Sequence, residues 1–489
     1  MVKAWKQYAI IFPIGAVLTI FGLVLGILWS TIYSNLVTSQ ISLSPSSANY
    51  ELWKETPIPM YLKLYMFNLT NPEALSSGNA LPHFEEMGPY VLREVDSKVQ
   101  LVWNDNGTIS YQRKRVWHFD ESLSKGNLLD KVTNLNPVAA SIVYTLRYQR
   151  VFVRDLVDRF MYSMNEPLVI TKTVQELLFD GYDDKVLKFA RKLKLTKIPM
   201  DRFAWFYGRN GSASYDGTFN MLTGATNLLD LGIVTNWNYD DKVSYYDGEC
   251  AKVKGTNGDL WPPLPDNKTV TFFVSDICTS LSATYENTTE YEGITGVRYI
   301  NDEMTLANGD LDPSRKCYCR GECIPSGALN ISLCKWGAPA FISFPHFYLA
   351  DPSYTAKLSG LNPSKENHEL KIALEPTTGV PLEVSAKLQL NLLLLRDEHM
   401  KIFQNVPNNT FVPILWFAQE AYLTSDYSNT VKLLLILRTL GSVTAYGIAA
   451  IGIMILCIGI FLCIRRNWKG EENQILLDRS DINDIHGIN

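Results

Sequence analysis

Charged residues are absent from two long stretches of the chain, and both stretches are strongly apolar. Residues 8–29 (YAIIFPIGAVLTIFGLVLGILW) and 440–464 (LGSVTAYGIAAIGIMILCIGIFLCI) exceed the roughly 20 residues with which a helix crosses a hydrocarbon core. A cleaved signal peptide is the alternative for the first stretch, but its apolar run is longer than the usual 7–15 residues of such a peptide. We therefore predict two transmembrane helices, at residues 8–29 and 439–464.

Basic residues at the outer ends of these stretches orient the chain in the membrane. Lys3 and Lys6 precede the first stretch, and a cluster of Arg and Lys follows the second. Since the cytoplasmic flanks of membrane spans are enriched in these residues, both termini are predicted to be cytosolic. The expected order is a tail at 1–7, a glycosylated ectodomain at 30–438 and a second tail at 465–489.

Potential glycosylation sites are confined to the predicted ectodomain. N-x-S/T sequences accept N-linked glycans on surface loops outside the cytosol, and they occur at seven ectodomain positions and at none in the tails. Their distribution agrees with the topology that the charges predict. The seven are Asn68, Asn106, Asn210, Asn267, Asn287, Asn330 and Asn408.

Six of the eight cysteines lie in the ectodomain, within 85 residues of one another. An even number of cysteines on the oxidising side of a membrane predicts disulfides. The C-x-C-x3-C spacing suggests zinc as an alternative, but no histidine lies between Cys250 and Cys334. Sequence alone leaves fifteen pairings open. The six are Cys250, Cys278, Cys317, Cys319, Cys323 and Cys334.

Alternating apolar and polar residues predict several strands in the ectodomain. Residues 381–392 place six apolar side chains on one face and polar side chains on the other. Residues 99–103 and 108–119 flank an Asn-Asp-Asn-Gly turn whose Asn106-Gly107 pair suits positive φ angles, which predicts a hairpin. Further strands are expected at 269–274 and 369–374.

Helical periodicity concentrates in residues 137–200, which we expect to form a helical bundle. Within 185–197, apolar residues recur at i, i+3, i+4 and i+7, and only basic charges lie between them. Because the ectodomain has 39 basic and 45 acidic residues, a net charge of −6, this helix is a local anion-attracting patch or else a solvated helix face. The candidate ligand-binding residues of this region are Lys185, Lys188, Arg191, Lys192, Lys194, Lys197, Phe152, Phe160 and Met161.

Composition excludes several classes of protein. A hydrophobic content of 46% is too high for a disordered chain, and a net charge of −5 offers no basic footprint for nucleic acid. Neither G-x-S-x-G nor H-E-x-x-H occurs. We therefore predict a protein that is not an enzyme and that needs no cofactor, with no catalytic and no metal-binding residues.

Short motifs along the whole chain resemble the class B scavenger receptor family. Each motif is weak alone, but their number and order are specific, and they accompany the two-span layout. They are residues 61–73 (YLKLYMFNLTNPE), 86–94 (EMGPYVLRE), 173–178 (TVQELL), 223–224 (TG) with Gly232, 237–238 (WN), 344–347 (FPHF) with Asp351, 375–379 (EPTTG) and 389–391 (QLN).

The resemblance implies a fold and a set of disulfides. The fold is an α+β ectodomain with an antiparallel β-barrel-like core, an apolar tunnel and an apical helical bundle, flanked by two transmembrane helices. The family pattern joins Cys250 to Cys317, Cys278 to Cys334, and Cys319 to Cys323. Some relatives carry a lysine pair just upstream of residues 173–178; this chain instead reads MYSMNE at 161–166, so the basic helix is expected to substitute.

The resemblance also implies a function, namely that the bundle binds lipids, lipoproteins or other anionic and apolar ligands. Fatty acids, sterols and phospholipids would then pass through the tunnel toward the membrane. An endo-lysosomal sorting receptor for a lumenal or extracellular protein is the alternative, and an ectoenzyme is a remote third. We expect a cell-membrane protein that cycles through endosomes or lysosomes.

The C-terminal tail carries a sorting motif. An acidic residue, Glu472, is followed four and five positions later by Leu476 and Leu477, the acidic dileucine pattern that clathrin adaptors bind. An unstructured polar tail without this role is the alternative.

The cysteines of the second span suggest palmitoylation, and the small residues of both spans suggest helix packing between copies of the chain. Cys463 lies at the cytosolic boundary and is a candidate for palmitoylation, with Cys457 a deeper second. Gly22-x3-Gly26 and the small residues at 441, 445 and 449 would allow close helix packing, which suggests a homo-oligomer.

Overall fold

The computed structural model describes residues 2–77, 80–193, 199–264 and 268–485. The chain folds as two compact units, residues 1–39 with 426–489 and residues 40–425. The first unit consists of parts of the long helices α1 (Val2–Ile41) and α8 (Ser425–Ile485). Their apolar segments, Ile10–Ile41 and Ser425–Lys469, are long enough to cross a membrane. The predicted spans lie within these helices, and the chain is a two-span membrane protein.

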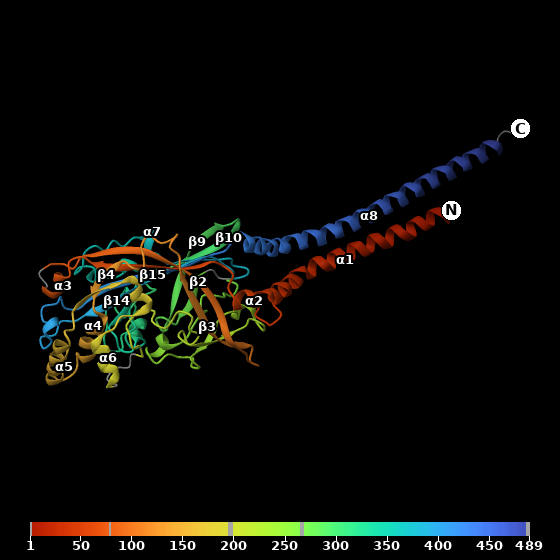
Figure 1. Ribbon diagram of the computed structural model, residues 1–489. Helices are drawn as coiled ribbons and strands as arrows, with labels where there is room; N and C mark the ends of the chain where they lie inside the picture. The colour runs from red at the N-terminus through yellow and green to blue at the C-terminus, as the bar shows by residue number, and fades with distance from the viewer. Residues whose placement is uncertain (1, 78–79, 194–198, 265–267, 486–489) are drawn as a thin grey trace. The chain divides into compact units, whose positions relative to one another are not determined.

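Small residues let α1 and α8 approach closely within one chain (Figure 1). A Cβ added at Gly22 would lie 2.4 Å from the backbone nitrogen of Ala449 and 2.7 Å from the carbonyl oxygen of Ala445. A Cβ at Gly26 would meet the ring of Tyr446 at 2.7 Å. Ala445 and Ala449 are buried by this contact. The small residues that we expected to pack between two copies of the protein therefore pack α1 against α8 of the same chain. Such residues allow close helix packing in membranes.

One large antiparallel sheet forms the ectodomain core. Its hydrogen-bonded order is β7-β6-β3-β2-β1-β15-β14-β13-β10-β9-β8, and β12 adds to β14 with β11 beyond it. The strands are β1 (Met60–Leu69), β2 (Phe84–Trp103), β3 (Thr108–Phe119), β6 (Thr218–Leu222), β7 (Val234–Trp237), β8 (Thr269–Val274), β9 (Thr279–Tyr291), β10 (Ile294–Ile300), β11 (Ala328–Asn330), β12 (Ala340–Ser343), β13 (Lys371–Leu374), β14 (Pro381–Leu394) and β15 (Thr410–Tyr422).

A short segment at Gly255 and Thr256 joins the two ends of this sheet. Val234 at the start of β7 donates its N–H to Gly255 O (2.8 Å), and Phe273 in β8 donates to Thr256 O (2.6 Å). Gly255 has φ +79°, and a Cβ there would lie 2.1 Å from Thr271 O, so only glycine allows this approach. The sheet is thus nearly closed, and the predicted antiparallel, barrel-like α+β fold is confirmed.

The predicted hairpin and strands are present. β2 and β3 pair in antiparallel register across the 104–107 turn, and Asn104 N–H donates to Thr108 O (2.9 Å). Gly107 adopts φ +74°, whereas Asn106 stays outside the left-handed region. β8 and β14 match the strands expected at 269–274 and 381–392, because local alternation suffices to predict them.

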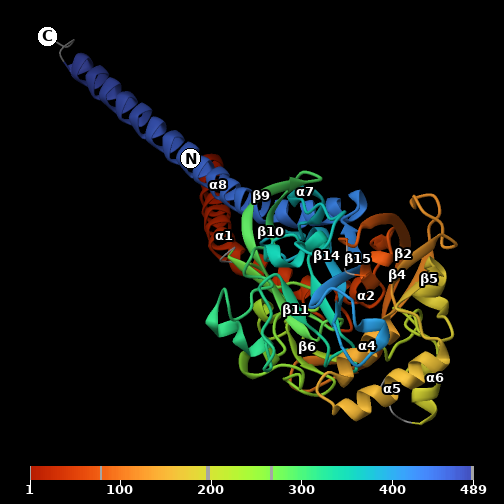
Figure 2. The ribbon, with the colours of Figure 1, turned by 90° about the vertical axis from the view of Figure 1, so that its left-hand side faces the viewer.

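Three helices, α4 (Pro137–Leu146), α5 (Val151–Met164) and α6 (Lys185–Lys192), lie together in both views (Figures 1 and 2). Polar N-caps begin two of them, since Asn136 accepts from the N–H groups of α4 and Asp184 from that of Leu187 in α6. A two-stranded sheet of β4 (Lys131–Leu135) and β5 (Val169–Thr173) adjoins them in sequence. Apolar side chains of α4, α5 and α6 join those of β1, β14 and β15 in one buried core.

The remaining helices are short. They are α2 (Ala48–Lys54), α3 (Glu73–Ser77), α7 (Lys365–His368), the π-helix η1 (Glu176–Asp180), and the 3-10 helices η2 (Leu228–Asp230), η3 (Gly248–Ala251), η4 (Pro313–Tyr318), η5 (Pro345–Phe347), η6 (Pro352–Tyr354) and η7 (Lys401–Phe403).

Candidate functional site

Within the described part of the ectodomain, an apolar cavity and a polar pocket lie on opposite faces of the central strands. On β15, Leu415, Phe417 and Gln419 line an apolar cavity. The alternate residues Trp416, Ala418 and Glu420 line a polar pocket. Successive side chains of a strand point to opposite faces of a sheet. One strand therefore forms a wall of both hollows.

The apolar cavity lies among the sheet, α4 and the segment 200–209. Its volume, measured for the centre of a water-sized sphere, is about 150 Å³. An engineered dry cavity of about that size binds benzene, so this one has room for a ring or a stretch of alkyl chain. Its apolar lining includes Leu62, Trp117, Phe203, Phe206, Ile342, Leu388, Leu390, Leu415 and Phe417.

A cluster of ion pairs forms one side of the apolar cavity. Arg209 bridges two carboxylates, with Nη2 2.9 Å from Asp216 Oδ1 and Nη1 2.7 Å from Asp276 Oδ1. Arg115 donates from Nε to Asp216 Oδ2 at 3.0 Å and lies 3.8 Å from Asp276. Burial alone would raise the pKa of Asp276, but Arg209 and Arg115 hold it below its ordinary value. Both carboxylates are therefore ionised at neutral pH.

Lys335 also lines the apolar cavity. Within the described part of the chain, its ammonium makes no hydrogen bond within 3.5 Å and no ion pair within 4.0 Å. Desolvation by the surrounding protein lowers the pKa of Lys335, and attraction to Asp276 opposes that change without cancelling it. The cavity thus presents a cation that no neighbouring side chain neutralises directly.

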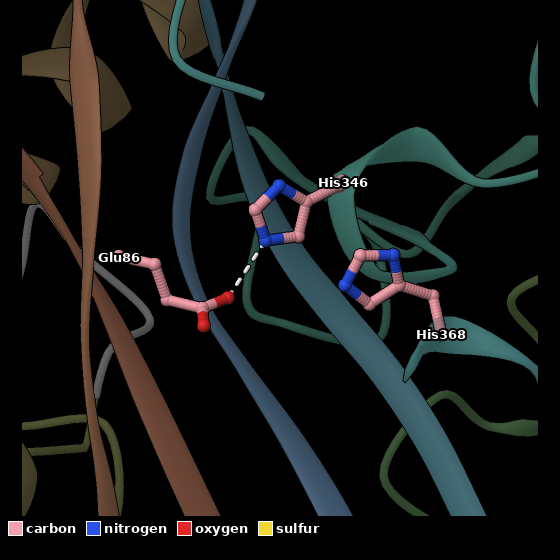
Figure 3. A group of neighbouring side chains, drawn as sticks. All are labelled: Glu86, His346 and His368. Carbon is pink, nitrogen blue, oxygen red and sulfur yellow. Dashed lines mark hydrogen bonds and ion pairs between the residues drawn. The ribbon is translucent and has the colours of Figure 1, made fainter. Parts of the chain in front are cut away.

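The polar pocket is centred on Glu86, His346 and His368, and its volume by the same measure is about 830 Å³. His346 Nε2 lies 2.7 Å from Glu86 Oε2 (Figure 3). Trp416 Nε1 donates to the same oxygen at 2.6 Å. These hydrogen bonds outweigh burial and lower the pKa of Glu86. Burial, reinforced by the stacked His346 ring, lowers the pKa of His368 to about 4.

These three side chains offer ligand atoms within 4.8 Å of one another, but the two imidazoles do not fit a divalent cation as they lie. Asn362 N–H donates to Nδ1 of His346 (3.1 Å), and Ser364 N–H donates to Nδ1 of His368 (2.9 Å). The proton of each neutral ring is therefore on Nε2, the nitrogen that faces the cluster in Figure 3. A metal-ligating histidine donates through its second nitrogen instead, so this cluster is a hydrogen-bond network.

Most of the described candidate ligand residues of the helical region lie on one exposed surface. We call it the α5–α6 surface, and it comprises Phe152, Leu156, Phe160, Tyr162, Lys185, Lys188, Phe189, Arg191 and Lys192. Phe152 is 75% exposed, and Phe160 packs on Phe189 with ring centroids 4.5 Å apart. Met161 is 2% exposed and belongs to the core, so it does not contribute to this surface. Lys185, Lys188 and Lys192 are exposed and Arg191 is half-buried; Lys194 and Lys197 lie outside the described residues.

One acidic residue that precedes the basic helix pairs with it. Lys188 Nζ lies 2.9 Å from Asp183 Oδ1, and both side chains are more than half exposed. An exposed pair of this kind is worth at most about 1 kcal/mol. The remaining described basic side chains of α6 leave the α5–α6 surface positive, next to exposed apolar residues such as Leu156 and Tyr162.

Three disulfides lie in the ectodomain. They join Cys250 to Cys317, Cys278 to Cys334, and Cys319 to Cys323. Cys457 and Cys463 are not in disulfides. The Cys278–Cys334 bond ties the loop that carries Lys335 to the strand end that carries Asp276.

The remaining predicted sites differ in accessibility. Four sequon asparagines are exposed (Asn106, Asn210, Asn287 and Asn408), and two are half-buried (Asn68 and Asn330). Asn267 lies outside the described residues. Glu472 is exposed on α8, and the side chains of Leu476 and Leu477 lie outside the described part.

The charged residues of the apolar cavity were not predicted from the sequence. Arg115 belongs to β3, Arg209 and Asp216 to the loop before β6, Asp276 to the turn after β8, and Lys335 to the loop before β12. No local spacing joins them, because tertiary folding alone brings them together. His346 of the polar pocket does fall in one of the family motifs, at 344–347.

Known proteins are similar to this chain in sequence over most of its length. The profile of the CD36 family matches residues 13–463. Protein peste of Drosophila melanogaster is 34% identical over 433 residues, 88% of this chain and 78% of that protein. Scavenger receptor class B member 1 of Mus musculus is 32% identical over 410 residues, 83% of this chain and 79% of its own length. Lysosome membrane protein 2 of Homo sapiens is 29% identical over 447 residues, 90% of each chain.

The profile match covers nearly the whole chain, including most of both apolar segments and the complete sheet. Two of these relatives are named as a class B scavenger receptor and as a lysosome membrane protein, which agrees with the predicted class B scavenger receptor family. The chain belongs to the CD36 family.

Proposed function

We propose that this protein is a receptor that takes lipid from lipoproteins or other carriers and passes it toward the membrane. The observation that carries the proposal is the apolar cavity in the core of an ectodomain that two apolar helices anchor. Well-formed apolar cavities with a few polar groups are the usual ligand sites of proteins. The α5–α6 surface supplies the place of first contact.

The physical reason for such a cavity is the cost of moving lipid through water. Each methylene group exposed to water costs about 0.8 kcal/mol, so a long acyl chain leaves its carrier slowly. A cavity walled by Phe203, Phe206, Leu388 and Leu415 offers a stretch of that chain an apolar environment. Transfer then proceeds between apolar sites and avoids the aqueous step.

The α5–α6 surface suits the outer layer of a lipid particle. Phe152 and Tyr162 expose 75% and 72% of their surface, and such amphipathic or apolar rings bury readily in a lipid interface. Lys185 and Lys192 of α6 add positive charge nearby, which attracts anionic head groups. Fatty acids, phospholipids and lipoproteins carry such groups, and sterols would follow through the apolar contacts.

A cavity-filling substitution tests this function. Ser141 lines the cavity from α4, so Ser141→Phe places an aromatic ring inside it. Cells that express this variant should take up tritiated cholesteryl ester and oleate from lipoprotein at less than one fifth of the wild-type rate. Thr145→Phe, one turn further along α4 and exposed, should leave uptake unchanged. Equal uptake by Ser141→Phe and wild type would remove the cavity from the transfer path.

A sorting role in the endo-lysosomal system is a second candidate function. The dileucine pattern in the tail favours it, and the relatives of this chain include lysosome membrane protein 2 of both rat and human. Clathrin adaptors are then the cytosolic partners, and a lumenal protein would be the cargo. Leu476→Ala with Leu477→Ala should at least double the surface fraction measured by biotinylation, whereas Ile482→Ala with Ile485→Ala should not. An unchanged surface fraction in the dileucine variant contradicts the sorting role.

A further inference from the structure

One buried side chain of the polar pocket has a hydrogen-bond donor without an acceptor. His368 is 4% exposed and lines the pocket. Its Nδ1 accepts the N–H of Ser364, so the proton of the neutral ring is on Nε2, which faces Glu86 and His346 in Figure 3. Within the described part of the chain, this Nε2 makes no hydrogen bond. A buried donor without a partner costs free energy, which a ligand with an acceptor would recover.

The imidazole of His368 is held in this orientation from two sides. Its ring stacks on that of His346, with centroids 4.5 Å apart, and Ser364 N–H lies 2.9 Å from its Nδ1. His346 is fixed in turn, because its backbone N–H donates to Gln389 Oε1 (2.6 Å) and its Nδ1 accepts from Asn362 N–H (3.1 Å). The free donor therefore points into the pocket before any ligand binds.

The polar pocket also carries an excess of negative charge. Four carboxylates line it against a single ammonium, that of Lys387. Lys63 pairs with one of them, since its Nζ lies 2.7 Å from Glu420 Oε2. The other three make no ion pair with a lysine or arginine in the described part of the chain; they are Glu85, Glu86 and Glu366. A cleft lined by one sign of charge concentrates ligands of the opposite sign, so the pocket favours a cation.

Two further polar groups of the pocket lack hydrogen-bond partners among the described residues. Glu86 accepts from His346 and Trp416 through Oε2 alone, which leaves Oε1 free to accept. Tyr65 also lines the pocket, and its hydroxyl makes no hydrogen bond; burial and the charge of Glu86 raise the pKa of Tyr65 to about 12, so it stays protonated. An ammonium could donate to Glu86 but could not accept from His368, whereas a hydroxyl group does both. The ligand must therefore combine an ammonium with hydroxyl groups.

We propose that the polar pocket binds a protonated amino sugar, whose ammonium lies among Glu85, Glu86 and Glu366 and whose hydroxyl groups accept from His368 Nε2–H. A cavity of about 150 Å³ holds benzene, so a pocket of about 830 Å³ has room for a six-membered ring with its substituents. The pocket lies on the opposite face of β15 from the apolar cavity, so this site goes beyond lipid transfer and does not depend on it.

The test uses three ligands that separate the charge from the hydroxyl groups. Glucosamine has both, N-acetylglucosamine lacks the charge, and cyclohexylamine lacks the hydroxyl groups. Full-length protein in phosphatidylcholine nanodiscs is titrated with each at pH 6.5, ligand-detected nuclear magnetic resonance gives each Kd, and empty nanodiscs provide the blank. The wild type should bind glucosamine at least tenfold more tightly than either of the other two.

Two variants assign the preference to the pocket. Glu366→Gln removes one unpaired carboxylate and should bind glucosamine at least fivefold more weakly, with its affinity for N-acetylglucosamine unchanged. His368→Phe removes the free donor but keeps a ring beside His346, and it should bind glucosamine and cyclohexylamine within threefold of each other. Glu303→Gln and His118→Phe change exposed side chains outside the pocket and should behave as the wild type.

Equal affinity of the wild type for glucosamine and either of the other two ligands, or no binding of glucosamine, would overturn the proposal. A tenfold preference that persists in both pocket variants would also overturn it, because the ligand would then lie elsewhere. Should His368→Phe fail to fold, Glu366→Gln decides, since its side chain is exposed. Uptake of labelled oleate should be unchanged in both variants, so failure of this site leaves the lipid-transfer function standing.

Discussion

The two hollows of the ectodomain share strand β15 but differ in almost every other property. The apolar cavity is narrow, walled by aromatic and leucine side chains, and carries one positive charge in excess. The polar pocket is larger, and in it Glu86 accepts hydrogen bonds from His346 and Trp416. Leu415 and Phe417 face the first, and Trp416 and Glu420 face the second. The period-2 geometry of a strand is therefore enough to keep two chemically opposite environments on either side of one sheet.

The two hollows also differ in how many hydrogen-bond partners their polar groups have. In the polar pocket, Glu86 Oε2 already receives two hydrogen bonds, and each imidazole Nδ1 accepts a backbone N–H. In the apolar cavity, the ammonium of Lys335 has no such partner within the described residues.

The largest expected loss of stability follows from breaking the ion pairs of the apolar cavity. Arg209→Met removes the cation that bridges Asp216 and Asp276, and it leaves the buried Asp216 and the half-buried Asp276 with Arg115 alone. Breaking a buried ion pair by removing one partner costs about 3–5 kcal/mol. Chemical denaturation of the full-length protein should show a loss of that size. A loss below about 1 kcal/mol would mean that the cluster is solvated.

The next largest expected loss of stability is in the polar pocket. Glu86→Ala leaves the N–H groups of His346 Nε2 and Trp416 Nε1 without their acceptor, and an unsatisfied buried donor costs about 1–3 kcal/mol. Stability should fall by that amount while uptake of labelled oleate stays at the wild-type level. Lost uptake with normal stability would instead make the polar pocket part of the transfer path, and the contrast between the two hollows would disappear.

The pH dependence of stability tests whether His368 of the polar pocket is buried. The pKa of His368 is about 4 in the folded protein and about 6.5 in an unfolded chain, so the unfolded chain binds more protons between those values. Stability should therefore fall as pH drops from 6.5 toward 4, with a slope of at most about 1.4 kcal/mol per pH unit from this residue. His368→Gln should flatten that slope. Nuclear magnetic resonance of the histidine ring should show no titration above pH 5; a midpoint near 6.5 contradicts the buried network.

The smallest expected change in stability is a gain, whereas the variants above lose stability. Lys335→Met removes a desolvated ammonium without breaking an ion pair, so stability at pH 7 should be unchanged or higher by up to about 1 kcal/mol. The lowered pKa of Lys335 means that the gain should shrink as pH rises toward 10.5. Differential scanning calorimetry at pH 7 and pH 10 measures this. A marked loss of stability would show that Lys335 is a structural residue.

Local features of the chain predicted a large part of the fold. The hairpin of β2 and β3 follows from alternation around an Asn-Gly turn, and β14 follows from twelve alternating residues. The two spans follow from the absence of charge. Each of these depends on interactions between residues that are close in sequence.

The sites depend on contacts that no local pattern contains. Arg115 and Lys335 are more than 200 residues apart, and only the tertiary fold brings them to one cavity. The basic helix α6 was visible in the sequence, but its neighbour Asp183 and the burial of Met161 were not. Tertiary packing determined which of the predicted residues are exposed.

Native mass spectrometry of the full-length protein, released gently from nanodiscs, tests the central claim most directly. If the apolar cavity is the lipid site, the wild type and Thr145→Phe should retain bound lipid, and Ser141→Phe should lose it while its circular dichroism spectrum stays unchanged. Lipid retained equally by Ser141→Phe, or absent from the wild type, would contradict the account.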